Sequence, residues 1–232
     1  MAKPGLFARE AAVRLLHAVL LERRLLIDLV NGEDSPLIDL EPNERARAQS
    51  LAMTTLRNLG PVDAVLEQFL TKQTPFSLLN ILRVAATEIL VDGIAAHAAV
   101  DAAVTMAKRR QKTEHLKNLA NAVLRKVASE GPAIFATLSP QELPKAFRSQ
   151  MSKIIPKEDF VAIELAHQLG APLDLSFKSM AQASLLAERL GGVLMPNGSV
   201  RLKRAGQITE LPGFTEGDWW VQDLAASIPA KC

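Results

Sequence analysis

The stretch TPFSLLNILRVAATEILV, residues 74–91, decides the fold class of this chain. Apolar side chains recur through it at helical spacing, so it predicts a buried helix over residues 76–91. Thr74 is expected to cap this helix, and Pro75 to take its first helical position, where the missing amide hydrogen costs nothing. The side chains expected in the core are Leu79, Leu82, Val84 and Ile89.

Helical patterns continue on both sides of this stretch, from Ala8 to about Ser129. A helix from near Pro42 is expected to end at Leu59-Gly60-Pro61, because glycine can turn left-handed and proline cannot continue the helix. Gly131-Pro132 is expected to end the whole helical region. Further helices are predicted over residues 62–70, 97–110 and 114–128, and the first one buries Ala12, Leu15, Leu16, Val19 and Leu20. The first half is therefore predicted to be an α-helical bundle.

The second half has a different pattern. Residues 173–178, LDLSFK, alternate strictly between apolar and polar, which predicts a half-buried strand. A helix over 179–190 is expected to end at Gly191-Gly192, and the strands 193–195 and 200–203 flank an Asn197-Gly198 hairpin turn. This order favours a small α+β unit of the split βαβ type. Helices are also expected after a capping box at 139–142, from Pro156 to His167, and within 214–231.

Composition narrows the protein class. The 232 residues are 48% hydrophobic but only 4% aromatic, with no tyrosine, so an aliphatic helical core is favoured over a β-sandwich or barrel. The single cysteine, Cys232, excludes an internal disulfide framework. No run of eighteen apolar residues occurs, and residues 1–10 lack a signal-peptide core. We therefore expect a cytoplasmic protein with no membrane partner.

The sequence shows no catalytic constellation. The four histidines, His17, His97, His115 and His167, fall on different expected helices and not in metal-ligand spacing, so no metal site is expected. Nucleophile-elbow, Walker and dinucleotide-binding motifs do not occur. Cys232 has no neighbouring base and is interpreted as incidental.

A net charge of +2 conceals one strongly basic segment. Residues 108–126 carry seven lysines and arginines against one glutamate, a net of +6. Two interpretations stay open: a solvated helical corner, or a surface that contacts several phosphates of a nucleic acid.

Motifs in the first half are similar to those of the NusB fold, a helical module that binds RNA in transcription antitermination factors. The similar segments are Glu44-Arg45-Ala46-Arg47, Leu56-Arg57-Asn58-Leu59, Ile81-Leu82-Arg83, Glu88-Ile89-Leu90, His97-Ala98-Ala99-Val100, Ala107-Lys108 and Asn121-Ala122-Val123-Leu124-Arg125. The same module forms the N-terminal domain of the Sun-type (Fmu) 16S rRNA cytosine-C5 methyltransferases. Leu211-Pro212-Gly213-Phe214 and Val221-Gln222-Asp223-Leu224-Ala225-Ala226-Ser227 resemble the entry to the methyltransferase domain of that group.

The resemblance implies a mainly α fold: a NusB-like helical bundle followed by a small α+β domain. It assigns residues 1–130 to a NusB-like RNA-binding domain, 131–213 to an α+β linker and RNA-binding domain, and 214–232 to the start of a truncated methyltransferase domain. In the family, the S-adenosylmethionine loop and both functional cysteines lie further downstream. This chain is therefore expected to hold no cofactor and to be inactive alone.

The resemblance and the charge pattern together suggest site residues. Gln222 and Asp223 resemble residues near the cofactor of the complete enzyme, or they only cap and orient the last helix. Trp219 and Trp220 either stack bases or fill the domain junction. The expected RNA contacts are Arg9, Lys108, Arg109, Arg110, Lys112, Lys117, Arg125, Lys203 and Arg204.

Each set of basic residues also has a structural interpretation. Arg125 could satisfy carbonyls at a helix end, and Arg9, with Arg14, could form salt bridges on the outer face of the first helix. Arg201, Lys203 and Arg204 could protect an exposed strand edge instead of reaching phosphates.

The first functional hypothesis is an RNA-binding region that positions 16S rRNA for a methyltransferase domain outside this chain. The second is a stand-alone NusB-like RNA-binding factor in transcription antitermination or ribosome assembly. The third is a helical module that binds only protein, such as a ribosomal protein.

Overall fold

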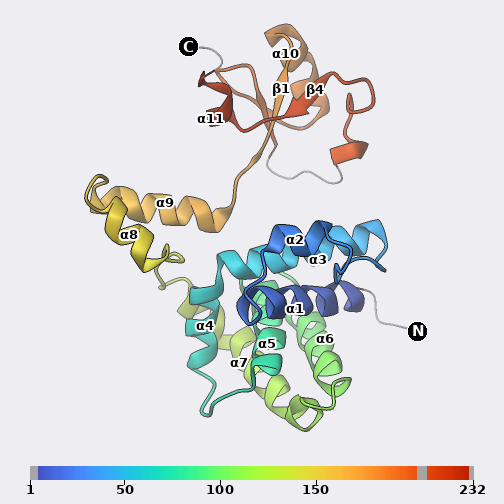
Figure 1. Cartoon of the computed structure of the whole chain (residues 1–232), viewed down its shortest axis with the longest axis vertical. Helices are drawn as coiled ribbons and strands as arrows, with labels where there is room; N and C mark the ends of the chain where they lie inside the picture. The colour runs from blue at the N-terminus through green and yellow to red at the C-terminus, as the bar shows by residue number, and fades with distance from the viewer. Residues whose placement is uncertain (1–4, 203–207, 230–232) are drawn as a thin grey trace. The chain divides into compact units, whose positions relative to one another are not determined.

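The computed structural model describes residues 5–202 and 208–229 and contains two compact units. One extends to Leu169 and is helical; the other begins at Gly170 and contains the sheet (Figure 1). Contacts thus group residues 131–169 with the helical bundle, although the sequence placed a boundary after residue 130. They also group residues 214–229 with the sheet, although the sequence assigned them to a separate domain.

The helical unit is built around α5 (Phe76–Leu90), which contacts α1, α3, α4, α6 and α7. Leu82 and Val84 are buried as predicted, while Leu79 and Ile89 are only partly buried. Thr74 does not cap α5: its hydroxyl donates to the Lys72 carbonyl, and the helix begins directly after Pro75. The surrounding helices are α1 (Leu6–Leu20), α2 (Leu26–Asn31), α3 (Pro42–Arg57), α4 (Leu59–Glu67), α6 (Ala96–Lys108), the 3-10 helix η1 (Glu114–Leu116) and α7 (Lys117–Phe135).

The Leu59-Gly60-Pro61 segment begins a helix and does not end one, so that prediction was wrong. The α3 helix stops at Arg57, and Gly60 and Pro61 lie in the first turn of α4. Proline is tolerated there because first-turn amides have no partner within the helix. Asn58 forms the junction: its side chain donates to the Thr54 carbonyl and accepts from Gln168.

The predicted break at Gly131-Pro132 was also wrong, because α7 continues through both residues to Phe135. Gly131 is buried, and a Cβ there would lie 3.1 Å from Leu90 Cδ2 and 3.4 Å from Val65 Cγ1. Glycine lets α7 approach its neighbours closely. This packing outweighs the helix-propensity cost of a glycine, about 1 kcal/mol.

Two short helices complete the helical unit, α8 (Lys145–Met151) and α9 (Lys157–Leu169). Helix α9 begins after Pro156 as expected. The capping box predicted at residues 139–142 is absent. Instead, the Gln141 side chain accepts a hydrogen bond from the Gly60 amide, and Glu142 pairs with Arg148 at 2.6 Å. Contacts with distant residues have replaced the local capping pattern.

The second unit holds a four-stranded antiparallel sheet in the order β2-β3-β1-β4, with α10 (Met180–Arg189) between β1 and β2 in the chain. Strand β3 lies between β1 and β2, which is the split βαβ arrangement that the sequence predicted. The strands are β1 (Leu173–Phe177), β2 (Val193–Leu194), β3 (Val200–Leu202) and β4 (Trp219–Val221), with the 3-10 helix η2 (Ile208–Glu210) and α11 (Leu224–Ser227).

Strand β1 is buried on both faces and not half-buried as predicted. Asp174 and Ser176 are buried together with Leu175, because β1 is an inner strand and polar partners cover its second face. Of the alanine-rich helix expected within 214–231, the described residues contain the four-residue α11, while Trp219–Val221 before it forms β4. Trp219 packs into this unit's own core, and its indole donates to the Pro212 carbonyl at 2.8 Å.

Gly191 and Gly192 end α10 as predicted. Gly191 has a φ of 62°, its amide donates to Glu188, and the Gly192 amide donates to Ala187, which together form a Schellman motif. A Cβ at Gly192 would collide with Val200 and would lie 2.6 Å from Leu202 Cδ2. Packing therefore favours glycine at position 192, and the left-handed backbone favours glycine at position 191.

We expect Gly192→Ala to lower the free energy of unfolding of the sheet unit by about 1–3 kcal/mol, because two buried β3 side chains must shift. Gly191→Asn is the matched control: its Cβ position is open, and asparagine tolerates the left-handed region, so a loss below about 1 kcal/mol is expected. Both tryptophans of the chain lie in β4, so urea unfolding followed by tryptophan fluorescence reports on this unit. Equal losses in the two variants would contradict the packing argument.

Candidate nucleic-acid interface

A groove of about 700 Å³ opens on the helical unit, and most of the charged side chains that line it are basic. Arg14 comes from α1, Arg24 from the loop after α1, and Arg110 and Lys112 from the loop between α6 and η1. Ser77 and Gln111 add uncharged polar groups, and His17 and Glu22 also line the groove. Four cationic side chains from three separate segments thus face one hollow.

Buried contacts hold the α6–η1 loop in place. The side chain of Thr113 is fully buried, and its hydroxyl donates to the Ala107 carbonyl at 2.8 Å. The Thr113 amide donates to the Arg110 carbonyl at 2.9 Å. These bonds tie the loop to the end of α6 and so position Arg110 and Lys112 at the groove.

The loop after α1 is held by an unusual backbone conformation. Arg23 has a φ of 61°, the single positive value among the described residues other than glycine. The next amide, that of Arg24, donates back to the Ala18 carbonyl at 3.1 Å. A left-handed arginine costs about 1 kcal/mol or more, and such residues concentrate at functional sites. Here the turn places Arg24 in the groove lining.

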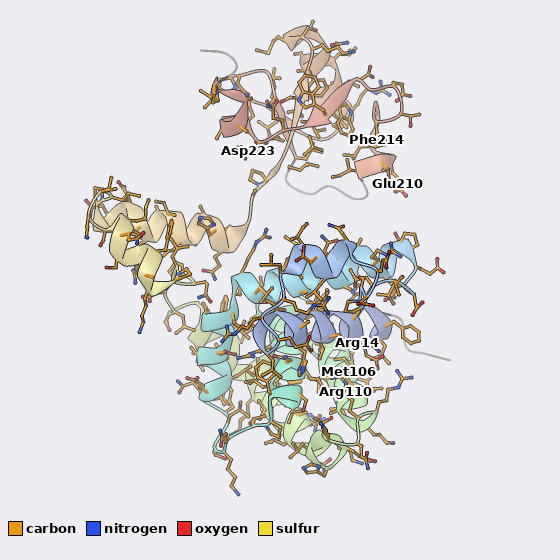
Figure 2. The ribbon with its side chains drawn as sticks, in the orientation of Figure 1. Arg14, Met106, Arg110, Glu210, Phe214 and Asp223 are labelled. Atoms are coloured by element: carbon orange, nitrogen blue, oxygen red, sulfur yellow. The ribbon has the colours of Figure 1, made fainter. Side chains whose placement is uncertain are left out.

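Arg110 is the groove residue whose charge is most clearly influenced by its surroundings. Burial holds the pKa of its guanidinium below the ordinary arginine value, and the nearby Arg14 lowers it further, while Glu10 acts in the opposite direction. Arginine starts from so high a pKa that Arg110 stays charged at neutral pH. Two like charges in a partly desolvated hollow are stabilised by an anion placed between them. Figure 2 labels Arg14 and Arg110 on this part of the bundle.

The surface changes sign immediately beside the groove. A neighbouring pocket of about 400 Å³ shares Arg14 and Pro36 with it, but its other charged side chains are Glu10, Asp39, Glu41 and Glu44. A polyanion in the basic groove is therefore confined on this side by carboxylates.

The structure brings only some of the expected RNA contacts together. Arg110 and Lys112 share the groove; Lys108 is exposed at the end of α6, and Lys117 is partly buried at the start of α7. Arg109 is bound to Glu10 at 2.9 Å. Arg125 lines a different groove, of about 430 Å³, with His97 and Asp101.

Arg9 does not lie on an outer face, and that expectation was wrong. Its side chain is 6% exposed, its Nε donates to Glu88 Oε2 at 2.6 Å, and its Nη1 donates to the Gly5 carbonyl. Arg47 approaches the other oxygen of Glu88 at 3.3 Å. Arg9 is thus a core cation that joins α1 to α5.

In the sheet unit, the structure describes only some of the basic residues that the sequence singled out. Lys203 and Arg204 lie outside the described residues. Arg201 forms two hydrogen bonds of 2.7 Å with buried Asp174 and so is engaged within the fold.

Asp223 caps α11 by accepting from the amides of Ala225 and Ala226, which confirms the capping interpretation (Figure 2). The Gln222 side chain accepts from the Trp220 indole. These local contacts assign no chemical step to either side chain.

Arg24 is the groove residue that sequence reasoning missed, and Arg14 was given too little weight. The available signal was the adjacent pair Arg23-Arg24, but its place beside residues 110–112 depends on how α1 packs against the bundle. In the described part of the chain, no group of three or more histidine, cysteine or acidic side chains could hold a metal ion. Nor is any helix there long and apolar enough to cross a membrane.

The chain is similar to known proteins in sequence and in fold. The chain is 31% identical over 244 residues to ribosomal RNA small subunit methyltransferase B of Pseudomonas putida, and 27% identical over 236 residues to that of Xanthomonas campestris pv. campestris. These alignments cover 96% and 97% of this chain but 53% of each relative. The chain thus spans about half the length of the curated relatives it matches, corresponding to their N-terminal half.

Among solved structures, "Crystal Structure of PH0851" covers the whole chain with a TM-score of 0.51 and 13% identity, while the chain covers 56% of that structure. This likeness concerns the fold alone. A second solved structure, NusB from T. maritima, has a TM-score of 0.48 and 23% identity to this chain. The match covers 60% of this chain and all of that structure. The NusB family model matches residues 7–129, from α1 into α7 and more than half of the sequence. The chain therefore belongs to the NusB family.

Proposed function

We propose that this chain is the RNA-binding N-terminal region of an S-adenosylmethionine-dependent rRNA cytosine-C5 methyltransferase, and that it positions 16S rRNA in the cytoplasm for a catalytic domain outside residues 1–232. The observation that carries the proposal is the groove of Arg14, Arg24, Arg110 and Lys112, with Arg110 partly desolvated beside Arg14. The two relatives share the name ribosomal RNA small subunit methyltransferase B, which supports the choice of substrate.

The groove suits a phosphate backbone better than an isolated small anion. Its four cations come from three segments and line a hollow of about 700 Å³, which spreads positive charge along a path. Four phosphate contacts to a single strand correspond to a slope of about −2.8 in log K against log salt. Arginine forks also bind phosphate oxygens in pairs, which favours arginine at such a site.

The domain assignment is part of the proposal. Residues 1–130 would supply the main RNA surface, residues 131–213 a linker that adds further RNA contacts, and residues 214–232 the connection to the catalytic domain. Lys108, Lys117 and Arg125 would extend the surface beyond the groove.

The test is RNA affinity, measured by fluorescence anisotropy on fragments that tile 16S rRNA. We expect the double variant Arg14→Glu, Arg110→Glu to bind the best fragment about 30- to 100-fold more weakly, because two phosphate contacts become repulsions. The salt slope should also become shallower by about 1.4, the share of two contacts.

Lys126→Glu is the matched control. Lys126 is exposed on α7, lies over the Phe69 ring at 6.0 Å, and does not line the groove, so its reversal should change affinity only slightly. An equal loss in the control would show a general charge effect and contradict the assigned groove. Absence of binding to every 16S fragment would overturn the proposal in favour of a protein-binding module or a factor for another RNA.

A further inference from the structure

Glu10 occupies an unusual position for an acidic residue at a basic site. Its carboxylate accepts a hydrogen bond from Arg109 Nη1 at 2.9 Å, and its side chain is only 16% exposed. It lies one helical turn before Arg14 on α1, and its charge also acts on Arg110. Glu10 therefore pairs with Arg109, lines the neighbouring pocket together with Arg14, and acts electrostatically on Arg110.

We infer that Glu10 competes with RNA phosphates for Arg109, and so sets the affinity of the groove for an RNA backbone. The inference rests on the proposed function, because it concerns the same groove. Arg109 donates to Glu10, a residue 99 positions away in the chain. A phosphate that recruits Arg109 must first displace this carboxylate.

The geometry allows Arg109 to exchange partners. Its side chain is 48% exposed, and within the described residues it has one charged partner, Glu10. By contrast, Arg9 is buried, and Arg201 is bound at two nitrogens. An ion pair of this exposure contributes about 0.2–1 kcal/mol, which is weak enough for a phosphate to replace it. Arg109 does not line the groove itself, but it is adjacent in the chain to Arg110, which does.

The acidic pocket beside the groove places Glu10 at the point where the surface changes sign. Glu10 lines that pocket with Asp39, Glu41 and Glu44, while Arg14 lines both hollows. Glu10 is the member of this acidic group that also holds a cation of the basic segment. Its charge thus opposes RNA binding in two ways, by pairing with Arg109 and by repelling phosphates at Arg14.

The test measures binding of a short oligouridine to the full chain as a function of salt. We expect Glu10→Gln to bind about three- to fivefold more tightly, and its salt slope to be steeper by about 0.7, because Arg109 becomes a free phosphate partner that releases a counterion. Oligouridine is used because it reports backbone contacts without a preferred sequence.

Glu22→Gln is the matched charge control. Glu22 also lines the groove, but its side chain is 48% exposed, and its Oε1 lies 4.0 Å from His17 Nε2. Within the described residues it forms no ion pair with an arginine. Removing this charge should give a smaller gain and leave the salt slope unchanged. If Glu22→Gln gave the same gain in affinity and the same change in salt slope as Glu10→Gln, the Glu10 result would reflect only a general charge effect. That outcome would overturn the inference.

A double-mutant cycle with Arg109→Gln gives the second test. If Glu10 acts by holding Arg109, most of the gain from Glu10→Gln disappears in the Arg109→Gln background. A gain that persists in full would overturn the inference. Failure of the proposed function has a different signature: the Glu10 effect on oligouridine is present, but no 16S fragment binds more tightly than oligouridine. No RNA binding by any variant would overturn both.

Discussion

Replacing Glu88 with alanine is expected to lower the free energy of unfolding of the helical unit by about 3–5 kcal/mol, the cost of breaking a buried ion pair. Glu88 is 2% exposed and accepts from Arg9 at 2.6 Å. Its removal leaves the Arg9 guanidinium, 6% exposed, without its carboxylate in an aliphatic core. Most domains have a total stability of only about 5–15 kcal/mol, so this variant approaches the limit of folding.

Arg47→Ala is the control for this prediction, because Arg47 contacts the same carboxylate at 3.3 Å but is 43% exposed. Its loss should cost less than about 1 kcal/mol. The measurement is urea unfolding followed by far-UV circular dichroism, which is dominated by the helical unit. If Glu88→Ala folds too poorly to titrate, the double variant Arg9→Met, Glu88→Met should recover much of the stability, since no unpaired charge remains buried. A Glu88→Ala loss no larger than that of Arg47→Ala would contradict the assigned role of the pair.

Replacing Asp174 with asparagine is expected to lower the free energy of unfolding of the sheet unit by about 2–4 kcal/mol. The carboxylate is fully buried, binds Arg201 through both oxygens at 2.7 Å, and accepts from the Leu224 amide at 3.1 Å. It thereby joins β1 to β3 and to the start of α11. Because Arg201 is 35% exposed and can be solvated, the expected loss is smaller than for Glu88.

The same carboxylate makes the stability of the sheet unit depend on pH. Hydrogen bonds from Arg201, and then from the Leu224 amide, hold the pKa of Asp174 below its usual value, although burial opposes them. A carboxyl with a lowered pKa in the folded state stabilises the fold above its unfolded pKa of about 3.9. This contribution is lost as the pH falls through the lower folded value. The free energy of unfolding of the sheet unit, followed by tryptophan fluorescence, should therefore decrease in acid. Asp174→Asn should remove this part of the pH dependence. A pH profile unchanged by the substitution would contradict the pKa argument.

Each of the two variants, Glu88→Ala and Asp174→Asn, serves as a control for the other. Trp219 and Trp220, the chain's two tryptophans, lie in the sheet unit, whereas most of the helix lies in the bundle. Glu88→Ala should shift the circular dichroism transition more than the tryptophan transition, and Asp174→Asn should do the reverse. Coincident shifts of both signals in both variants would show that the two units unfold as one.

Local patterns were enough for elements whose ends are set by their own residues. The buried helix over residues 76–91, the Gly191-Gly192 terminus and the Asn197-Gly198 hairpin all depend on side-chain period or on a left-handed glycine. Local reasoning failed at Gly131, where a glycine that usually ends helices is required for contact with Leu90. It also failed at β4, because strand formation there depends on pairing with β1.

The candidate site was also only partly predictable from local sequence. Charge counting identified the basic segment at residues 108–126, because lysines and arginines concentrate there whatever the fold. It could not separate Arg110, which lines the groove, from Arg125, which lines another, or show that Arg14 and Arg24 join Arg110. Nor could it show that Arg9 is neutralised by Glu88, 79 residues away.

The sequence by itself determined the helical class of the first half, the split βαβ unit and the location of the basic segment, because these follow from residue periodicity and composition over short distances. The tertiary structure alone decided which cations face the groove and which are held inside the fold. Charge acts through space, and partners such as Glu10 and Arg109 are brought together only when distant helices pack.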